Sequence, residues 1–218
     1  MIFLNKYDII SWLGEWRNKV KNVKYIDLFS GIGGFHLAME ENGFEMVMAC
    51  EKNEKARQTY IENFGDKYDL KNENLFPKDI TLLDEKKIPD FDILCAGFPC
   101  QAFSIAGKQK GFEDTRGTLF FDVARILKYK KPEYFILENV SNLLKHDEGK
   151  TLEVISNTLT ELGYIFDFKI IKLSDHGLPQ NRPRIYIIGS KNKKELSFPS
   201  PIKLKYNMSD VLGGNCKK

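Results

Sequence analysis

Short apolar runs alternate with helix-like patterns along most of this chain, and that alternation constrains its fold more than any other feature. Residues 23–29 form a continuous apolar run that ends in turn residues, which is typical of a buried strand. Helical spacing follows at 32–43 and stops at Gly43. The same patterns predict strands at 44–51, 91–97, 133–139, 164–173 and 184–190, and helices at 53–65, 118–130 and 151–163. The alternation predicts an α/β fold with a doubly wound, mostly parallel sheet, which binds ligands at the carboxyl ends of its strands.

Length and composition narrow the class of protein further. The 218 residues are 42% hydrophobic, enough for one good-sized core, and the net charge of +3 permits a nucleic-acid partner without requiring one. No apolar run reaches the length of a membrane span, and Asp8 and Glu15 interrupt the N-terminal apolar pattern, unlike in a signal peptide. Four cysteines in a chain this long are not needed as disulfide staples, so we expect a reducing cytoplasm.

The turn after the first predicted strand has the features of a nucleoside cofactor site. "DLFSGIGGF" (27–35) places Gly31 and Gly33 between strand and helix, where a ligand can approach the backbone closely. His36 stands where the dinucleotide fingerprint needs a third glycine, which weakens a nicotinamide-dependent oxidoreductase as an alternative. Glu51 ends the next strand, where a carboxylate can accept hydrogen bonds from ribose hydroxyls. S-adenosylmethionine, which has ribose and adenine but no diphosphate, fits this pattern; a turn without chemical consequence is the alternative.

A cysteine follows a proline in "GFPCQAFS" (97–104), after the strand at 91–97. Pro99 ends that strand and polar residues follow, so we expect the Cys100 thiol to face a crevice, whereas Cys95 within the strand is expected to be packed in the core. The spacing of the cysteines and the lack of well-spaced histidines argue against zinc, and no metal is expected. Glu138 ends the neighbouring predicted strand, and a buried carboxyl group there needs a partner. A thiol beside a carboxyl group suits attack by sulfur on a substrate that the acid protonates or hydrogen-bonds.

Four ordered blocks then resemble one enzyme family. "DLFSGIGGF", "GFPCQAFS", "ENV" and "QNRPRIYIIG" resemble, in this order, the signature blocks of the DNA cytosine-5 methyltransferases, and the stretch from 97 to 126 is especially similar to enzymes of bacterial restriction–modification systems. The similarity runs from about 24 to about 200. It implies a Rossmann-like, S-adenosylmethionine-dependent methyltransferase domain that acts on double-stranded DNA.

The resemblance also implies roles for individual residues. Glu51 would bind the ribose and Asp79 the adenine amino group; the cofactor pocket as a whole would comprise Phe29, Gly31, Ile32, Gly33, Glu51, Asp79, Ile80, Phe98 and Leu119. The implied catalytic residues are Cys100, which would attack C6 of the cytosine, Glu138, which would hold N3 and the exocyclic amine, and Arg182 and Arg184, which would orient the base and its phosphate. DNA contacts are expected from the long polar loop at 98–116, at Gln101, Ser104, Lys108 and Arg116, although from sequence alone plain solvation is the better explanation of its lysines.

The chain also departs from the family pattern. The family has a variable target-recognition domain and C-terminal motifs after the block at 180–189, and neither is found here. We therefore divide the chain into an N-terminal helical extension (1–22), a catalytic domain (23–200) and a tail (201–218). Three explanations are open: a split enzyme completed by a second polypeptide, a truncated and inactive chain, or partial filling of the gap by the extension. The intact catalytic positions favour the split enzyme; a binding-only subunit and a tRNA cytosine-5 methyltransferase are the alternative functions.

Overall fold

The computed structural model describes residues 22–100, 119–192 and 196–203. Of the predicted helical extension (1–22), residues 1–21 lie outside the described residues, as do residues 204–218 of the predicted tail (201–218). The division into three parts therefore stays a prediction. None of the described helices is both long and apolar enough to cross a membrane.

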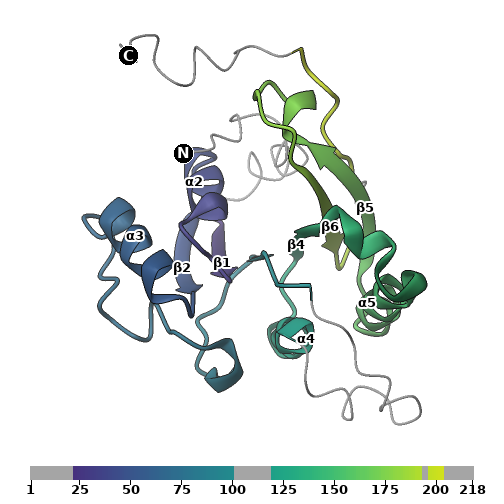
Figure 1. Cartoon of the computed structure of the whole chain (residues 1–218). Helices are drawn as coiled ribbons and strands as arrows, with labels where there is room; N and C mark the ends of the chain where they lie inside the picture. The colour runs from purple at the N-terminus through teal and green to yellow at the C-terminus, as the bar shows by residue number, and fades with distance from the viewer. Residues whose placement is uncertain (1–21, 101–118, 193–195, 204–218) are drawn as a thin grey trace, which may run out of the picture.

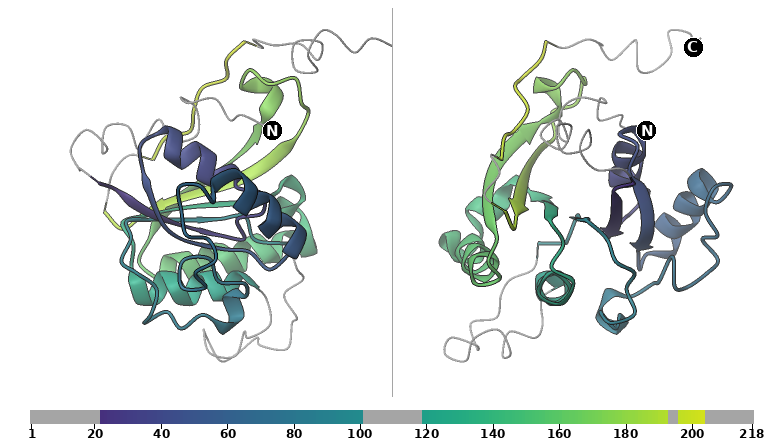
Figure 2. Two further views of the ribbon diagram at one scale, coloured as in Figure 1. Left: turned by 90° about the vertical axis from the view of Figure 1, so that its left-hand side faces the viewer. Right: turned by 180° about the vertical axis from the view of Figure 1, so that it is seen from behind.

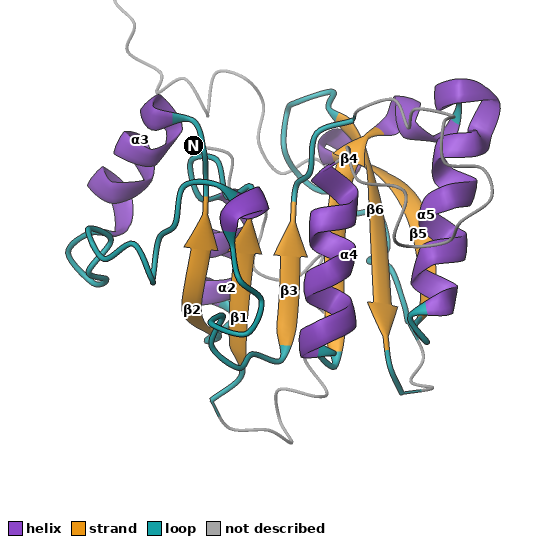
Figure 3. Cartoon of the chain, turned by 90° about the horizontal axis from the view of Figure 1, so that it is seen from below, coloured by secondary structure: helices purple, strands orange, loops and turns teal. Residues whose placement is uncertain are grey.

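The described residues form one six-stranded sheet with helices on both faces (Figures 1 and 3). Every strand and helix predicted between residues 23 and 190 is present, with small shifts at the ends. The strands are β1 (Lys24–Leu28), β2 (Glu45–Cys50), β3 (Ile93–Ala96), β4 (Tyr134–Val140), β5 (Ile165–Lys172) and β6 (Pro183–Ser190), and the main helices are α2 (Gly34–Glu41), α3 (Glu54–Phe64), α4 (Leu119–Lys130) and α5 (Lys150–Glu161). Asn53 caps α3 by accepting hydrogen bonds from the backbone N–H groups of Lys55 and Ala56, as an N-cap residue does.

The strand order is β2-β1-β3-β4-β6-β5, and the first four strands are parallel. β6 is the exception, because it runs antiparallel to both β4 and β5. The reason is the connection from β5 to β6 at 173–182, which holds only the short 3-10 turn Leu173–Asp175 and no crossover helix. Without such a crossover two consecutive strands pair antiparallel. The sheet is therefore mostly parallel with one reversed strand.

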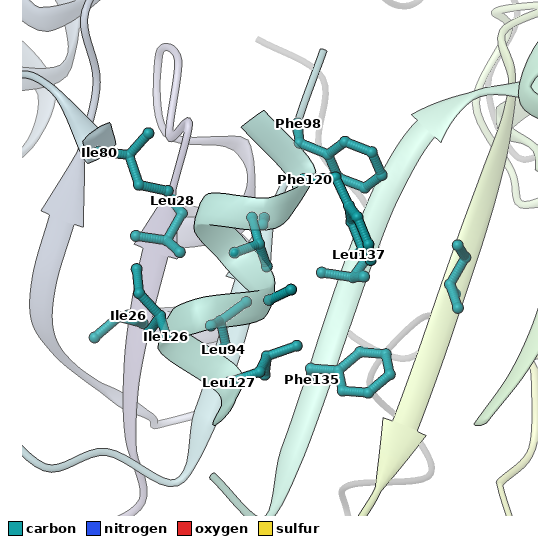
Figure 4. Close-up of a cluster of buried hydrophobic side chains, with 14 of the residues drawn as sticks. Ile26, Leu28, Ile80, Leu94, Phe98, Phe120, Ile126, Leu127, Phe135 and Leu137 are labelled. Carbon is teal, nitrogen blue, oxygen red and sulfur yellow. The ribbon is translucent and has the colours of Figure 1, made fainter. Parts of the chain in front are cut away.

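Two apolar clusters hold the helices to the sheet. One lies between the sheet and helices α4 and α5, and Figure 4 shows Ile126 and Leu127 of α4 over Ile26 of β1, Leu94 of β3 and Phe135 of β4. The other lies on the opposite face, where Met39 of α2 and Tyr60 of α3 pack on the sheet. Figure 3 shows α4 and α5 in front of the sheet and α2 behind it, and Figure 2 gives two further views of these layers.

This packing fixes where the polar segments lie. Each fully buried aliphatic or aromatic side chain contributes about 1.5 to 3 kcal/mol to the free energy of unfolding, so the strands are held firmly in register. Because β1, β2, β3 and β4 are parallel, their carboxyl ends meet at one edge of the sheet. The segments that follow Leu28, Cys50 and Ala96 are therefore brought together there, beside the last part of β4, where Leu137 pairs with Ala96.

Candidate active site

The turn between β1 and α2 is held by the carboxylate of Glu51, which follows β2. Its Oε2 accepts a hydrogen bond of 2.8 Å from the backbone N–H of Gly31, and its Oε1 accepts one of 2.7 Å from the backbone N–H of Asn53. Gly31 has a φ of +56°, and the space where a Cβ would stand on it is open. Phe29 also has a positive φ, +57°, which is uncommon for a residue with a side chain. The predicted glycine turn and its carboxylate are thus in contact.

Asp79 forms a second acidic position beside this turn. It follows the segment that pairs with the edge of β2 through the backbone N–H of Glu51 and the carbonyl of Pro77, which are 3.3 Å apart. The Asp79 carboxylate accepts hydrogen bonds from the Lys52 ammonium, at 2.7 Å, and from the backbone N–H of Thr81, at 3.0 Å. The Lys52 contact is the largest cause of the lowered pKa of Asp79. Asp79 is therefore anionic at neutral pH.

The apolar residues assigned to the pocket differ in exposure. Ile80 and Phe98 are buried in the cluster under α4, where Phe98 packs against Phe120 with ring centres 5.6 Å apart (Figure 4). Phe29 and Leu119 are partly buried against the same cluster. Ile32 is 59% exposed, so its side chain is free to contact a ligand. The buried pair forms the floor of this region, and Ile32 stands at its rim.

The carboxyl group of Glu138 lies where β3 and β4 end side by side. Its Oε2 is 3.5 Å from the position that a Cβ on Gly97 would take, so Gly97 leaves room for the carboxyl group next to the segment that leads to Cys100. Burial is the largest cause of the raised pKa of Glu138. The neighbouring Asn139 donates a hydrogen bond of 2.9 Å from Nδ2 to the carbonyl of Phe98, which ties the β4 end to the Phe98–Cys100 segment.

Two arginines of the "QNRPR" block act on Glu138. Arg184 Nε lies 3.0 Å from Glu138 Oε1. Arg184 and the exposed Arg182 both act to lower the pKa of Glu138, against the larger effect of burial. The expected partner of this half-buried carboxyl group is therefore Arg184. The antiparallel direction of β6 makes the contact possible, because it brings the start of β6 beside the end of β4.

The Cys100 thiol is partly buried and packs at the edge of the cluster under α4. Burial raises its pKa. Cys95, by contrast, is fully buried within β3, which confirms its predicted core role. The predicted DNA contacts at Gln101, Ser104, Lys108 and Arg116 lie outside the described residues.

Sequence analysis missed three residues that shape this region: Lys52, Arg57 and Asn139. Lys52 directly follows Glu51, and Asn139 lies inside the quoted "ENV" block, so position along the chain could have drawn attention to both. Arg57 gave no signal, because its partners are backbone carbonyl groups, which any residue type can supply.

The comparisons with known proteins decide the family. The family model for the C-5 cytosine-specific DNA methylases matches residues 23–213. The chain belongs to this family. It is 50% identical over 197 residues to the type II methyltransferase M.HhaI of Haemophilus parahaemolyticus, and 49% identical over 202 residues to M.SsoII of Shigella sonnei; the matches cover 89% of this chain in both cases. The resemblance seen in the sequence is confirmed, and a nicotinamide-dependent oxidoreductase is excluded.

The solved structures confirm the fold. The chain matches a DNMT2 mutant of Spodoptera frugiperda with a TM-score of 0.64 and 26% identity, over 84% of this chain and 54% of that one. It matches the Dnmt2 methyltransferase of S. pombe with a TM-score of 0.62 and 24% identity, over 81% of this chain and 52% of that one. The Rossmann-like fold of S-adenosylmethionine-dependent methyltransferases is therefore established. The chain spans 58% of the length of M.HhaI and 51% of that of M.SsoII, so it corresponds to about half of these relatives.

Proposed function

We propose that this chain is the catalytic part of a DNA cytosine-5 methyltransferase, which transfers a methyl group from S-adenosylmethionine to C5 of a cytosine in double-stranded DNA. One observation carries the proposal: the Glu138 carboxyl group, held by Arg184, lies beside Gly97 at the sheet edge where the Gly31–Glu51 turn also stands. The family model supports the same reaction class.

The residues at the cofactor turn suit S-adenosylmethionine. Open space at Gly31 and the exposed side chain of Ile32 leave room for a ligand against the backbone. The carboxylates of Glu51 and Asp79 flank this space as acceptors, which matches the hydroxyl and amino donors of an adenosine group. When bound, S-adenosylmethionine supplies a methyl group on a positively charged sulfur. Glu51 would hold the ribose and Asp79 the adenine.

Glu138 would act on the cytosine ring. Its raised pKa keeps a larger fraction of the group protonated near neutral pH than an exposed glutamate has. A protonated carboxyl group can donate to N3 of cytosine, and its second oxygen can accept from the exocyclic amine. This contact draws electrons away from C6 and so favours attack there. Arg184 would keep the carboxyl group oriented and stabilise its charge after the proton has moved.

Cys100 would be the nucleophile that attacks C6. A carbon–sulfur bond forms, the C5–C6 double bond opens, and C5 becomes nucleophilic enough to accept the methyl group. Loss of the C5 proton then restores the double bond and expels the Cys100 sulfur. The attacking species is the thiolate, so the Cys100 thiol must first give up its proton to solvent. Because burial raises the pKa of this thiol, the thiolate fraction is small, and protonation of cytosine N3 by Glu138 would make C6 electrophilic enough for that fraction to attack.

The proposed reaction also makes demands on how DNA binds and on the parts of the enzyme outside this chain. A stacked cytosine cannot reach groups at a sheet edge, so it must flip out of the duplex. The loop at 98–116 would then contact the DNA through Gln101, Ser104, Lys108 and Arg116. The matched region covers only 58% of M.HhaI and 51% of M.SsoII, so we propose that a second polypeptide supplies target recognition and the remaining motifs, as part of a restriction–modification system in a bacterial cytoplasm.

Two alternatives are tested together with the main proposal. The protein, with its complementing polypeptide, would be incubated with duplex DNA and S-adenosylmethionine carrying a radioactive methyl group. We expect label in the DNA, and no label with Cys100→Ser. Label in tRNA but not in DNA would favour the tRNA methyltransferase, and cofactor binding without label in either would favour a binding-only subunit.

A second measurement isolates the covalent step. DNA containing 5-fluorocytosine retains the sulfur adduct, because fluorine at C5 cannot leave as a proton does. With S-adenosylmethionine and the complementing polypeptide present, we expect a stable adduct with the wild-type chain and none with Cys100→Ser. Cys95→Ser, in the core, is a control for the loss of any thiol. An adduct that persists in Cys100→Ser would overturn the assignment of the nucleophile.

A further inference from the structure

The segment that carries Asp79 and Ile80 has little regular structure of its own. Between the end of α3 at Phe64 and the start of β3 at Ile93, the only helix or strand is the 3-10 turn Ile80–Leu82. Two backbone hydrogen bonds join the segment to β2, from Ala49 to Leu75 and from Glu51 to Pro77. These hold its first part. The Asp79 carboxylate itself is held by Lys52 and Thr81, and the backbone on either side of Asp79 has further support.

Arg57 of α3 provides support from one side. Its guanidinium donates to three backbone carbonyl groups: Nη1 to Glu51 and to Pro77, at 3.0 Å each, and Nη2 to Phe76, at 2.8 Å. Its Cζ lies 3.9 Å from the centre of the Phe76 ring. The side chain is 5% exposed, so it is buried. The Arg57 side chain thus connects the backbone of Glu51 to the backbone of Phe76 and Pro77, just before Asp79.

Arg125 of α4 provides support from the other side. Its guanidinium donates from Nη1 to the carbonyl of Leu83, at 2.8 Å, and from Nη2 to the carbonyl of Ile80. The same group contacts the carboxylates of Glu85, at 2.6 Å, and of Asp122, at 3.0 Å. Its contacts therefore begin directly after Asp79.

We propose that Arg57 and Arg125 are positioning residues that brace this segment from both sides and thereby preorganise the adenine end of the cofactor pocket. The inference rests on the proposed cofactor site. The two arginines act through backbone carbonyl groups on either side of Asp79, so they fix the acidic side chain without touching it. A guanidinium suits this role because its planar fork of five N–H donors can satisfy several carbonyl groups at fixed angles, and a lysine ammonium cannot reproduce that geometry.

The test measures the affinity of the full chain for S-adenosylhomocysteine by titration calorimetry. We compare the wild type with Arg57→Met, Arg57→Lys and Arg125→Met. We expect the dissociation constant to rise at least tenfold in both methionine variants. Arg57→Lys keeps the charge but not the fork, so we expect it to remain at least fivefold weaker than the wild type.

A second ligand separates positioning from a general loss of stability. S-inosylhomocysteine lacks the adenine amino group that Asp79 is proposed to accept from, so the wild type should bind it more weakly than S-adenosylhomocysteine. The methionine variants should lose this preference, because Asp79 is no longer held in place. Leu159→Ala removes a fully buried side chain of α5 away from the pocket. It should lower the melting temperature but keep the preference.

The outcomes distinguish the two proposals. If the wild type binds neither ligand, the proposed cofactor site fails. If the wild type binds and the folded arginine variants bind within twofold of it, with the same preference for the adenine ligand, the bracing role is overturned. If Leu159→Ala also loses the preference, the effect comes from stability and the bracing role is likewise overturned.

Discussion

The Nε of Arg184 lies 3.0 Å from the Oε1 of Glu138, across the antiparallel pairing of β6 with β4. The register places Arg184 opposite Val140 and Tyr186 opposite Glu138, so the contact is diagonal between neighbouring strands. Both side chains keep about a fifth of their surface exposed, 20% for Arg184 and 23% for Glu138. The pair is therefore sheltered enough for the charge of Arg184 to oppose part of the rise in the pKa of Glu138 that burial causes, while a substrate can still reach the carboxyl group.

Glu138→Gln should change how stability depends on pH. Burial raises the pKa of Glu138 in the folded protein, so between its unfolded and folded pKa values the folded state binds more protons than the unfolded state. In the wild type, the free energy of unfolding therefore falls as the pH rises above about 4.5, and it stops falling once the pH has passed the pKa of Glu138 in the folded state. The free energy of unfolding of Glu138→Gln, relative to wild type, should therefore rise with pH over this window. Urea unfolding between pH 4 and 8 measures it.

The free energy of unfolding of Glu138→Gln must be compared with that of the wild type, because Asp27 changes stability with pH in the same direction as Glu138. Asp27 is fully buried, and burial raises its pKa as well. Its contribution is common to both proteins and cancels in the difference. Arg184→Met should move the window to higher pH, because the arginine lowers the pKa of Glu138. A difference that stays flat, or falls with rising pH, would show that Glu138 is not held in its protonated form.

Gly33→Ala should destabilise the protein by about 2 to 4 kcal/mol, through left-handed backbone strain and overpacking. Gly33 has a φ of +96°, and a Cβ placed on it would lie 2.3 Å from Cε2 of Phe64 and 3.3 Å from Cδ2 of Tyr60. The Phe64 ring has little freedom to move, because it stacks on His36 with ring centres 3.9 Å apart. Thermal or urea unfolding measures the loss.

The adjacent Gly34→Ala is the matched control. No atom lies within 4 Å of a Cβ placed on Gly34, and the residue begins α2. Alanine favours a helix over glycine by up to about 1 kcal/mol, so this variant should be neutral or slightly more stable. Equal losses from both substitutions would mean that the close approach of Phe64 does not determine the need for glycine at 33.

How far the sequence predicts this molecule depends on the kind of partner that each residue has. Glu51 and Glu138 were identified because they stand at the ends of apolar runs predicted as strands, and parallel strands bring their carboxyl ends to one edge. In the structure Glu51 directly follows β2, and Glu138 lies within β4. The reversed direction of β6 was not predicted, because an apolar run shows a strand but not its direction. Arg57 was missed for a different reason: it binds carbonyl groups 19 and 20 residues away, and carbonyl groups carry no sequence signature.

Glu51→Gln should weaken the binding of S-adenosylhomocysteine at least tenfold. Both carboxylate oxygens accept from backbone N–H groups, those of Gly31 and Asn53. A glutamine offers one oxygen and turns its NH2 group toward the other N–H, so one of the two contacts becomes repulsive. The turn then loses its position, and the proposed ribose acceptor loses its charge. Titration calorimetry at pH 7 measures the effect.

Glu54→Gln is the control for this variant, because it removes one negative charge three residues later. Glu54 pairs with Lys78 at 2.7 Å, and the glutamate side chain is 68% exposed, so the pair is a surface one. Solvent screens such an exposed ion pair, so the affinity for S-adenosylhomocysteine should stay within twofold of wild type. An equal loss in both variants would point to net charge rather than to the Glu51 contacts.

Asn139→Ala should lower the rate at which the chain forms the covalent adduct with 5-fluorocytosine DNA, and by more than a control variant that is similarly destabilised. The Nδ2 of Asn139 donates to the buried carbonyl of Phe98, which is two residues before Cys100, so the substitution leaves that carbonyl without its partner. Such a loss costs about 1 to 3 kcal/mol of unfolding free energy. It also frees the segment that carries the thiol relative to Glu138. Asn139→Asp should act alike, because a carboxylate cannot donate to Phe98.

Thr158→Ala is the control for stability. It removes a hydrogen bond to Val154 within α5 and should lower the free energy of unfolding without slowing trapping at 25 °C. If Thr158→Ala and Asn139→Ala slow trapping equally, the tie between β4 and the cysteine segment has no role beyond folding.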